Sequence, residues 1–323
     1  MDQPAVISEL DVSLYPAGTR YPLLLDLVEN AAGLPTRIPI LLARGRKPGP
    51  FMGMMAAVHG NEINGIPVLH RLFDWLTDRP LSGTIAAVLI TNVPGFHMHQ
   101  REFLDGQDLN KIMPGKPDGS VSEVYAFRLL DKLVSSFDYL LDLHTASFGR
   151  INSLYARVDA GDPLALKMAR LLRPQIILEN EPGDGTVRGA ASHLGIPSVT
   201  FEIGNPQRFQ RDYIRDSVAG IRRVLEALGM VAKTKPSKKP PREPVVCRRS
   251  EWLYADRGGL LVVHPHLTDI VERGESIAVL RDIYGTIVRE YRAPYRGIVI
   301  GKSVNPVGGT GARILHLGEI KEP

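Results

Sequence analysis

The chain has 323 residues, of which 44% are hydrophobic, 23% charged and 7% aromatic, a composition typical of a soluble globular protein and unlike collagen-like, fibrous or disordered chains. Its net charge of +4 does not indicate a nucleic-acid partner, because residues 231–249 carry four Lys and three Arg against one Glu, and the rest of the chain sums to −2. No apolar run approaches the ~20 residues of a membrane-spanning helix, so we expect neither nucleic acid nor membrane as a partner.

Apolar runs rich in Val, Ile and Leu alternate with segments of helical period through residues 1–232. This alternation predicts an α/β fold in which helices cover a doubly wound, mixed but mainly parallel sheet. The first two predicted strands are expected to pair as an antiparallel edge. In chain order the predicted strands are Leu23–Val28, Ile38–Ala43, Phe51–His59, Thr84–Asn92, Asp138–Thr145, Pro174–Asn180 and Pro197–Gly204.

Three helices are predicted in the gaps between these strands. One runs over Asn64–Thr77. A second begins at Ser120, because Ser120 and Glu123 have the spacing of a capping box. The third spans Tyr213–Leu228 and is ended by Gly229.

A Pro- and Lys-rich stretch, residues 233–246, predicts a solvated linker between two domains, because prolines resist both helix and sheet pairing. After it, residues 247–323 contain short β-rich runs between Gly, Pro and Asp turns, which predicts a small all-β domain. That domain is similar to the barrel-sandwich modules of lipoyl and biotinyl carriers. No lysine stands in a carrier-like hairpin, so we do not expect a swinging arm.

The single cysteine and the N-terminus indicate the compartment. Cys247 has no partner for a disulfide within the chain and cannot build a cysteine zinc site alone, so any metal must be held by His and carboxylates. The opening MDQPAVISEL lacks the basic and apolar blocks of a secretory signal. We therefore predict a cytoplasmic protein.

Polar side chains follow the predicted strands where the carboxyl ends of parallel strands meet. In the segment AAVHGNEINGI, His59 ends an apolar run and Glu62 follows three residues later across a turn containing Gly60. An imidazole and a carboxylate at this spacing can converge on one ion, and zinc suits both. Alone, the pattern is weak and more typical of a satisfied surface pair.

In the segment DYLLDLHTASFG, His144 emerges at the end of a buried strand, and Asp142 lies two residues earlier on the same face. Asp142 is a candidate to hold the tautomer of a metal-bound imidazole. A hydrogen-bonded core histidine is the alternative. Glu202 lies near the end of another apolar strand, where a carboxylate is costly unless it is paired, metal-bound or functional.

In a doubly wound sheet, His59, His144 and Glu202 share one edge. Three protein ligands leave zinc an open position for water, and a free carboxylate nearby can accept its proton, which predicts a hydrolase. The long polar segment after Asn92 supplies Arg101, Asp108, Asn110 and Lys111. The cations among them indicate a small anionic substrate, unless they are solvated loop charges.

Two His-x-His pairs lack carboxylates at ligand spacing, and two further histidines are expected on helix surfaces. We interpret them as surface or hydrogen-bonding residues: His97, His99, His264, His266, His70 and His193.

Taken together, the motifs HGNE, NVPG with Arg101 and DLNK, DLHT and TFEIG resemble those of the succinylglutamate desuccinylase and aspartoacylase family, a branch of the zinc carboxypeptidase superfamily. The resemblance covers about Phe51–Pro206, and the β-rich tail is also similar to that family's C-terminal domain. It implies a zinc carboxypeptidase-like fold with one zinc per chain. It also implies that His59, Glu62 and His144 bind the metal, and that Glu202 acts as general base and then general acid.

The resemblance further implies that Arg101 polarises the scissile carbonyl and that Asn110 and Lys111 engage the substrate carboxylate. The family commonly has arginine where Lys111 stands, and lysine keeps the charge but loses the bidentate fork. Arg188 matches a position of a substrate-facing arginine in the family, or is a helix-surface charge. Candidates for the cleft wall in the C-terminal domain are Tyr284, Tyr291 and Tyr295, with packing inside that domain as the alternative.

The leading hypothesis is a zinc amidohydrolase that removes the acyl group from a small N-acyl amino acid or a related N-acylated amine. A carboxypeptidase or short-peptide amidase would use the same machinery. A zinc-containing binding or regulatory protein without catalysis is the alternative of another class. Family analogy alone suggests a homodimer.

Overall fold

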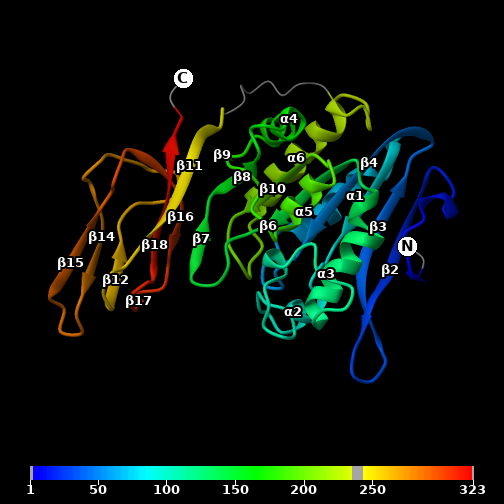
Figure 1. The fold of residues 1–323 in the computed structure, drawn as a ribbon. Helices are drawn as coiled ribbons and strands as arrows, with labels where there is room; N and C mark the ends of the chain where they lie inside the picture. Colours follow the sequence, from blue (N-terminus) through cyan, green and yellow to red (C-terminus); the bar gives the residue numbers. More distant parts are fainter. Residues whose placement is uncertain (1–2, 235–242, 322–323) are drawn as a thin grey trace.

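A computed structural model describes residues 3–234 and 243–321. Within these residues, fourteen strands form one mixed sheet in the order β1-β2-β3-β5-β4-β6-β10-β8-β9-β11-β18-β16-β13, with β7 joined to β16. A second sheet has the order β15-β14-β12-β17. Figure 1 shows the large sheet running through the centre of the molecule toward the C-terminal strands.

The strands of the first region enclose a parallel centre, in which β4 pairs parallel to both β5 and β6, and β6 pairs parallel to β10. This arrangement confirms the predicted α/β fold with a mainly parallel sheet, and the predicted antiparallel pair at its edge is β2 with β3. In chain order the strands are β1 (Ala5–Ile7), β2 (Thr19–Glu29), β3 (Pro35–Arg44), β4 (Lys47–Ala56), β5 (Ser82–Val88), β6 (Tyr139–His144), β7 (Arg150–Asn152), β8 (Leu154–Val158), β9 (Ile176–Glu179) and β10 (Ser198–Ile203).

Helices cover both faces of this sheet. They are α1 (Gly65–Leu76), α2 (Val93–His97), α3 (Val121–Lys132), α4 (Pro163–Leu172), α5 (Val187–His193) and α6 (Arg211–Ala227), with short 3-10 turns η1 (Val12–Leu14), η2 (Leu109–Lys111) and η3 (Val134–Ser136). Apolar residues of α1, α4 and α6 pack with one face of the strands, and those of α3 and α5 pack with the other. Leu141 and Leu143 face the first core, so the alternating residues Asp142 and His144 point to the α3 and α5 side.

The predicted helix signals are confirmed. Ser120 and Glu123 form the reciprocal capping box at the start of α3. After α6, Gly229 has a φ of +72°, the left-handed conformation that suits glycine after a helix end. The structure also contains elements that were not named among the predicted ones: strands β1, β7 and β8 and helices α4 and α5. The polar segment after Asn92, which the sequence suggested was a loop, contains the short turns α2 and η2.

The C-terminal strands are β11 (Val245–Tyr254), β12 (Gly259–Val263), β13 (Ile270–Val271), β14 (Ser276–Arg281), β15 (Ile287–Arg292), β16 (Gly297–Ser303), β17 (Val307–Gly308) and β18 (Arg313–Ile320). All elements of the described residues from Val245 on are strands, which confirms the predicted β-rich C-terminal region. Residues 235–242 of the predicted linker lie outside the described residues, and β11 begins at Val245, within the predicted linker range. The division into residues 1–232, 233–246 and 247–323 stays a prediction.

The C-terminal strands continue the central sheet. Strand β11 pairs parallel to β9, and β16 pairs antiparallel to β7, which follows the strand that carries His144. Backbone hydrogen bonds thereby join the C-terminal region to strands β7 and β9 of the sheet that bears the predicted site. No helix in the described part of the chain is long and apolar enough to cross a membrane.

Candidate active site

The HGNE segment forms a tight turn directly after β4. Strand β4 ends at Ala56, Ala57 adopts a φ of +53°, and the backbone N–H of Glu62 donates to the carbonyl of His59 at 3.0 Å. The turn brings His59 Nδ1 to 3.0 Å from Glu62 Oε1. Both side chains are buried.

Gly60 is required in this turn by close packing. A Cβ built on Gly60 would lie 2.0 Å from the carbonyl carbon of Gly95 in α2. Gly60 itself does not have a positive φ; in this segment the residue that does is Ala57. Any side chain at position 60 would push the metal-site turn away from α2.

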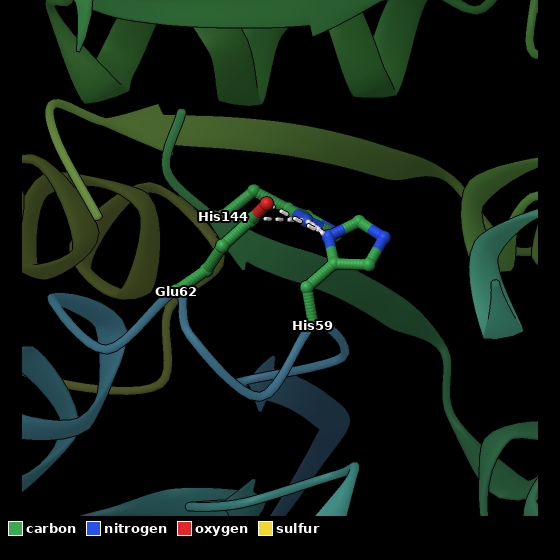
Figure 2. Close-up of side chains that lie close together, drawn as sticks. All are labelled: His59, Glu62 and His144. Carbon is green, nitrogen blue, oxygen red and sulfur yellow. Dashed lines mark hydrogen bonds and ion pairs between the residues drawn. The ribbon is translucent and has the colours of Figure 1, made fainter. Parts of the chain in front are cut away.

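His144 completes a cluster of three potential ligands. Its Nδ1 lies 3.0 Å from Glu62 Oε2 and 3.2 Å from His59 Nδ1, and one ligand atom from each residue lies within 4.8 Å of the others. Figure 2 shows the two imidazole rings and the carboxylate turned toward one point. The structure therefore brings His59, Glu62 and His144 together, as the sequence predicted. Within the described residues no other group of this kind occurs.

The far side of each imidazole contacts a carboxylate. His144 Nε2 lies 2.8 Å from Asp142 Oδ2, and His59 Nε2 lies 3.0 Å from Asp108 Oδ1. A carboxylate at Nε2 holds the proton on that nitrogen and leaves the lone pair at Nδ1. Two such lone pairs would face each other at 3.2 Å, which is repulsive unless a proton or a cation lies between them. The arrangement fits a divalent cation bound by nitrogen and oxygen ligands.

Charges in the cluster reinforce one another. Burial opposes charge on Glu62, but His59 and His144 hold its pKa well below the usual range. Burial likewise opposes protonation of His144, yet Asp142 and Glu62 raise its pKa well above the ordinary value. Glu62 therefore stays ionised, and the carboxylates around His144 favour a positive charge beside it.

Arg101 lies beside this cluster. Its guanidinium contacts Glu62 Oε1 at 3.0 Å and Asp108 Oδ2 at 2.9 Å. The side chain is 26% exposed and lines the cavity described below. Arg101 therefore lies next to the potential ligands and lines the same cavity.

Glu202 comes from β10, where it is the register partner of His144 on β6, so both side chains leave the same face of the sheet. Asn152 Nδ2 donates to Glu202 Oε2 at 3.2 Å, and Arg157 Nε lies 3.6 Å from Oε1. Burial raises the pKa of Glu202, with Arg157 acting in the opposite direction. A buried carboxylate with a raised pKa beside a potential metal centre is suited to accept and return a proton.

These residues surround one cavity of about 310 Å³. Its lining is mostly polar and contains four arginines. The lining residues are His59, Glu62, Arg101, Asn110, His144, Thr145, Ala146, Ser147, Arg150, Asn152, Tyr155, Arg157, Asn180, Gly183, Thr186, Arg188, Thr200, Glu202 and Trp252.

Two of the three predicted substrate-binding residues line the cavity, and the third does not. Asn110 lines the cavity, and its Oδ1 accepts a hydrogen bond from the N–H of Val187 at the start of α5. Arg188 also lines the cavity and is buried, so it is not a helix-surface charge; burial lowers its pKa to about 10. Lys111 is exposed and is not among the lining residues, so its predicted contact with substrate has no support from the geometry.

The predicted tyrosines of the C-terminal region do not reach the cavity. Tyr284 is 91% exposed, Tyr291 donates to Asp256 and Tyr295 donates to the carbonyl of Leu317. The C-terminal wall is formed instead by Trp252 of β11. The remaining histidines of the predicted surface set are exposed, as expected: His70, His97, His99, His193, His264 and His266.

Sequence reasoning missed several residues of the site. Asp108 stood in the polar segment without a role, although its position two residues before Asn110 marked it as part of the same loop. The unassigned cavity residues Arg150, Arg157 and Trp252 come from β7, β8 and β11, strands that the sequence did not place near the histidines. Alternation along LYARV was the available signal, since it puts Tyr155 and Arg157 on one face.

Comparison with known families decides the identity of the fold. The sequence profile of the succinylglutamate desuccinylase/aspartoacylase catalytic domain matches residues 48–228. The chain belongs to this family. The matched residues include every candidate ligand and Glu202.

Relatives and solved structures agree with this assignment. An N-alpha-acetyl-L-2,4-diaminobutyric acid deacetylase from Halomonas elongata is 27% identical over 301 residues, which cover 88% of this chain and 86% of that protein. The product-bound ectoine utilization protein EutE (DoeB) from Ruegeria pomeroyi has a TM-score of 0.83 at 22% identity, covering 95% of this chain and 97% of that one. A succinylglutamate desuccinylase/aspartoacylase from Rhodobacter sphaeroides has a TM-score of 0.84 at 22% identity, with coverage of 97% and 98%. The two structures share the fold of the family across nearly the whole chain.

Proposed function

We propose that this protein is a zinc-dependent deacylase that hydrolyses the amide bond of a small N-acyl amino acid or related N-acylated amine, with water as the nucleophile. The single observation that carries the proposal is the convergence of His59, Glu62 and His144 in one cavity with Glu202. The name of the Halomonas elongata relative, a deacetylase of an N-acetylated amino acid, supports the same reaction class.

The donor set supports zinc as the cofactor, one per chain. Two imidazole Nδ1 atoms and one carboxylate form a three-residue set that leaves a position open for water and substrate. When bound, zinc would lower the pKa of water to near 7 and polarise the amide carbonyl. Asp142 and Asp108 would keep the two imidazoles in the tautomer that binds metal.

Glu202 is the proposed proton carrier. Its carboxylate is buried, is oriented by Asn152, and has a pKa raised by burial, which brings it closer to neutral pH than an exposed glutamate. It would take a proton from the attacking water and deliver it to the leaving nitrogen. The free amine and the free acid are the products, and no proton is left over.

Arg101 is the proposed stabiliser of the oxyanion. It lies within 3.0 Å of Glu62 and faces the cavity, so its guanidinium is available to the carbonyl oxygen of a bound amide. Removing one such donor from an acyl-transfer site typically costs about 3–4 kcal/mol of transition-state stabilisation. Asn110 and Arg188 are proposed to hold the substrate, which the cavity limits to a small molecule.

The experiment that tests the function joins metal analysis to a substrate screen. Purified protein is expected to contain about one zinc per chain and to release amine from N-acyl amino acids in preference to dipeptides. A preference for dipeptides would replace the deacylase with a carboxypeptidase or amidase. Metal-loaded protein without turnover across a broad amide panel would indicate the non-catalytic binding protein instead.

Two variants separate the roles within the site. Glu202→Gln keeps the shape of the side chain and is expected to lower kcat by about 10²–10⁴-fold while zinc stays bound. His144→Ala is expected to strip the zinc, because it removes a ligand. Loss of metal in the first variant, or full metal content in the second, would reverse the two assignments.

A further inference from the structure

The carboxylate of Glu202 is held from strand β7. Asn152, the last residue of that strand, donates from Nδ2 to Glu202 Oε2 at 3.2 Å, and both side chains line the cavity. Arg157 Nε lies farther from the carboxylate, at 3.6 Å from Oε1. The orientation of the proposed proton carrier therefore depends on where β7 places the Asn152 amide.

Strand β7 is held in turn by the C-terminal region. Among the described residues its sheet partner is β16 alone, with Asn152 opposite Gly301. The next residue, Ser153, donates to the carbonyl of Ile300 from both its backbone N–H and its hydroxyl, each at 2.9 Å. Figure 1 shows β7 beside the C-terminal strands. Asn152 is thereby positioned by a strand that lies about 150 residues farther along the chain.

Gly301 leaves room for the amide of Asn152. A Cβ built on Gly301 would lie 2.4 Å from Asn152 Oδ1 and 3.0 Å from the carbonyl oxygen of Ile151. The first distance is too short for any contact, and the amide can yield because it is the end of a side chain that rotates. A methyl group at position 301 would therefore turn the amide away, together with the donor that Glu202 accepts from.

A second support comes from Asn205, in the loop after β10. Its Oδ1 accepts a hydrogen bond from the backbone N–H of Asn152 at 3.3 Å. Asn205 stands three residues after Glu202 in the chain. One short segment therefore carries the carboxylate and also holds the backbone of the residue that orients it.

The same loop is tied to the turn of potential metal ligands. Gln210 Oε1 accepts from the N–H of Asn205 at 2.6 Å and from Asn64 Nδ2 at 3.2 Å, and the N–H of Gln210 donates to Asn64 Oδ1 at 3.1 Å. Asn64 is fully buried and stands two residues after Glu62. A buried network whose members are paired is rigid, so these amides hold the loop of Glu202 in fixed relation to the ligand turn.

We propose that Gly301 and Asn205 are positioning residues for Glu202 that act through Asn152. The inference rests on the proposed function, since Glu202 is its proton carrier. Neither Gly301 nor Asn205 lines the cavity, so both act on Asn152 and not on the substrate. The C-terminal region then supports the chemistry through β16, in addition to closing the cavity with Trp252.

The first test compares two glycines of β16. Gly301→Ala is expected to lower kcat by about 10–100-fold with KM within about threefold and zinc content unchanged, because a misplacement of about 1 Å can cost about 100-fold in rate. Gly297→Ala is the matched control. A Cβ at position 297 would lie 2.6 Å from the backbone carbonyl oxygen of Gly318, so the backbone itself must move, at the other end of the strand from Asn152.

We expect Gly297→Ala to lower the Tm more than Gly301→Ala and to keep kcat within about threefold of the wild type. A purely structural role of Gly301 predicts the opposite, namely that kcat follows Tm in both variants. Should Gly297→Ala fail to fold, Ile298→Val removes one buried methyl group of the same strand and serves as the control.

The second test uses rescue at Asn205. Asn205→Ala removes the acceptor for the Asn152 N–H and is expected to lower kcat by about tenfold with KM within about threefold. Asn205→Asp keeps an acceptor of the same shape and is expected to stay within about threefold of the wild type. Arg208→Ala changes an exposed residue of the same loop and should match the wild type. Equal loss in Asn205→Ala and Asn205→Asp would overturn the role of Asn205.

Failure of this inference and failure of the proposed function give different results. In an active enzyme, unchanged turnover in Gly301→Ala, or a raised KM at constant kcat, would overturn the inference and leave the deacylase intact. If the wild type hydrolyses no amide, crystal structures of the wild type and Gly301→Ala still measure the contact between Asn152 and Glu202. Loss of that contact in the variant would support the positioning, and an unchanged contact would overturn it.

Discussion

The cavity has two walls with different origins. The histidine wall, which consists of His59, Glu62, His144 and Glu202, comes from β4, β6 and β10 or the turn that follows, neighbours in the parallel centre of the sheet. The arginine wall comes from β7, β8, α5 and β11, and consists of Arg150, Arg157, Arg188 and Trp252. The first wall is built by strand ends, the second by the meeting of the central sheet with the C-terminal strands.

This difference suggests a division of labour. Parallel strands place their carboxyl ends at one edge of the sheet, whichever loops follow them. The residues of the histidine wall, which need a fixed geometry for chemistry, lie at this edge. Part of the arginine wall depends on how β11 and β16 join β9 and β7, because Trp252 lies on β11 and Arg150 on β7. We infer that reaction type is set by the first wall and substrate choice by the second.

The largest expected effect concerns Asp108, which contacts His59 of the histidine wall. Its Oδ1 lies 3.0 Å from His59 Nε2, so Asp108→Asn weakens the partner that orients an imidazole proposed to bind the metal. Changes to such partners typically cost 10–100-fold in metal affinity. We expect a loss of about that size, measured by competition with a chromogenic chelator.

Asp105 provides the control for this change. It lies in the same polar segment, is exposed, and bonds to Ser122 without contact to the histidines. Asp105→Asn is expected to leave metal affinity unchanged. Equal affinity in wild type and Asp108→Asn would remove Asp108 from the support of the metal centre.

The histidine wall could be predicted from sequence because each of its members is marked by a short local pattern. His59 and His144 end apolar runs, Glu202 interrupts one, and parallel pairing then fixes their meeting without any knowledge of side-chain contacts. The same holds for the capping box at Ser120 and the glycine after α6. Patterns of this kind involve only residues that are close together in the sequence, so they can be recognised without knowing the tertiary structure.

Only part of the arginine wall could be predicted: Arg188 was a candidate from the resemblance and Arg157 had the signal of strand alternation, but nothing local marks Arg150 or Trp252 as cavity residues. Trp252 lies 94 residues beyond the end of β8 in the chain and reaches the cavity only because β11 joins the sheet next to β9. The tyrosines at positions 284, 291 and 295 are also aromatic residues of the C-terminal region, but they lie on β15 or in the turns on either side of it. Which aromatic residue closes the cavity is decided by strand order, a property of the whole sheet.

A smaller effect concerns His316, whose ring stacks on Trp252 of the arginine wall. It tests whether His316 is neutral in the folded protein. Burial, together with Arg157, Arg150 and Arg313, holds the pKa of His316 well below its usual value. The folded protein therefore keeps His316 neutral while the unfolded chain takes up a proton below about pH 6.5, so stability falls as the pH falls. His316→Phe keeps a ring under Trp252 and removes this proton.

We expect the wild type to lose up to about 2 kcal/mol more unfolding free energy than His316→Phe between pH 7 and pH 5, by urea denaturation at each pH. His264→Gln changes an exposed histidine of the same C-terminal region and should keep the wild-type pH dependence. An identical slope in His316→Phe would show that His316 is charged or open to water in the folded protein.

The smallest expected effect lies at Lys111, where the sequence departs from the arginine that the family commonly has. Lys111 is exposed and stands outside the cavity lining, whereas its neighbour Asn110 lines the cavity and receives the N–H of Val187. Lys111→Gln is therefore expected to change kcat/KM by less than about twofold, because an exposed charge is well screened by water. Asn110→Ala is expected to cost about tenfold, since it leaves a helix-start donor unpaired and removes a polar group from the cavity. If Lys111→Gln instead raised KM as much as Asn110→Ala, Lys111 would have to swing into the cavity when substrate binds, and anion recognition would no longer be confined to the arginine wall.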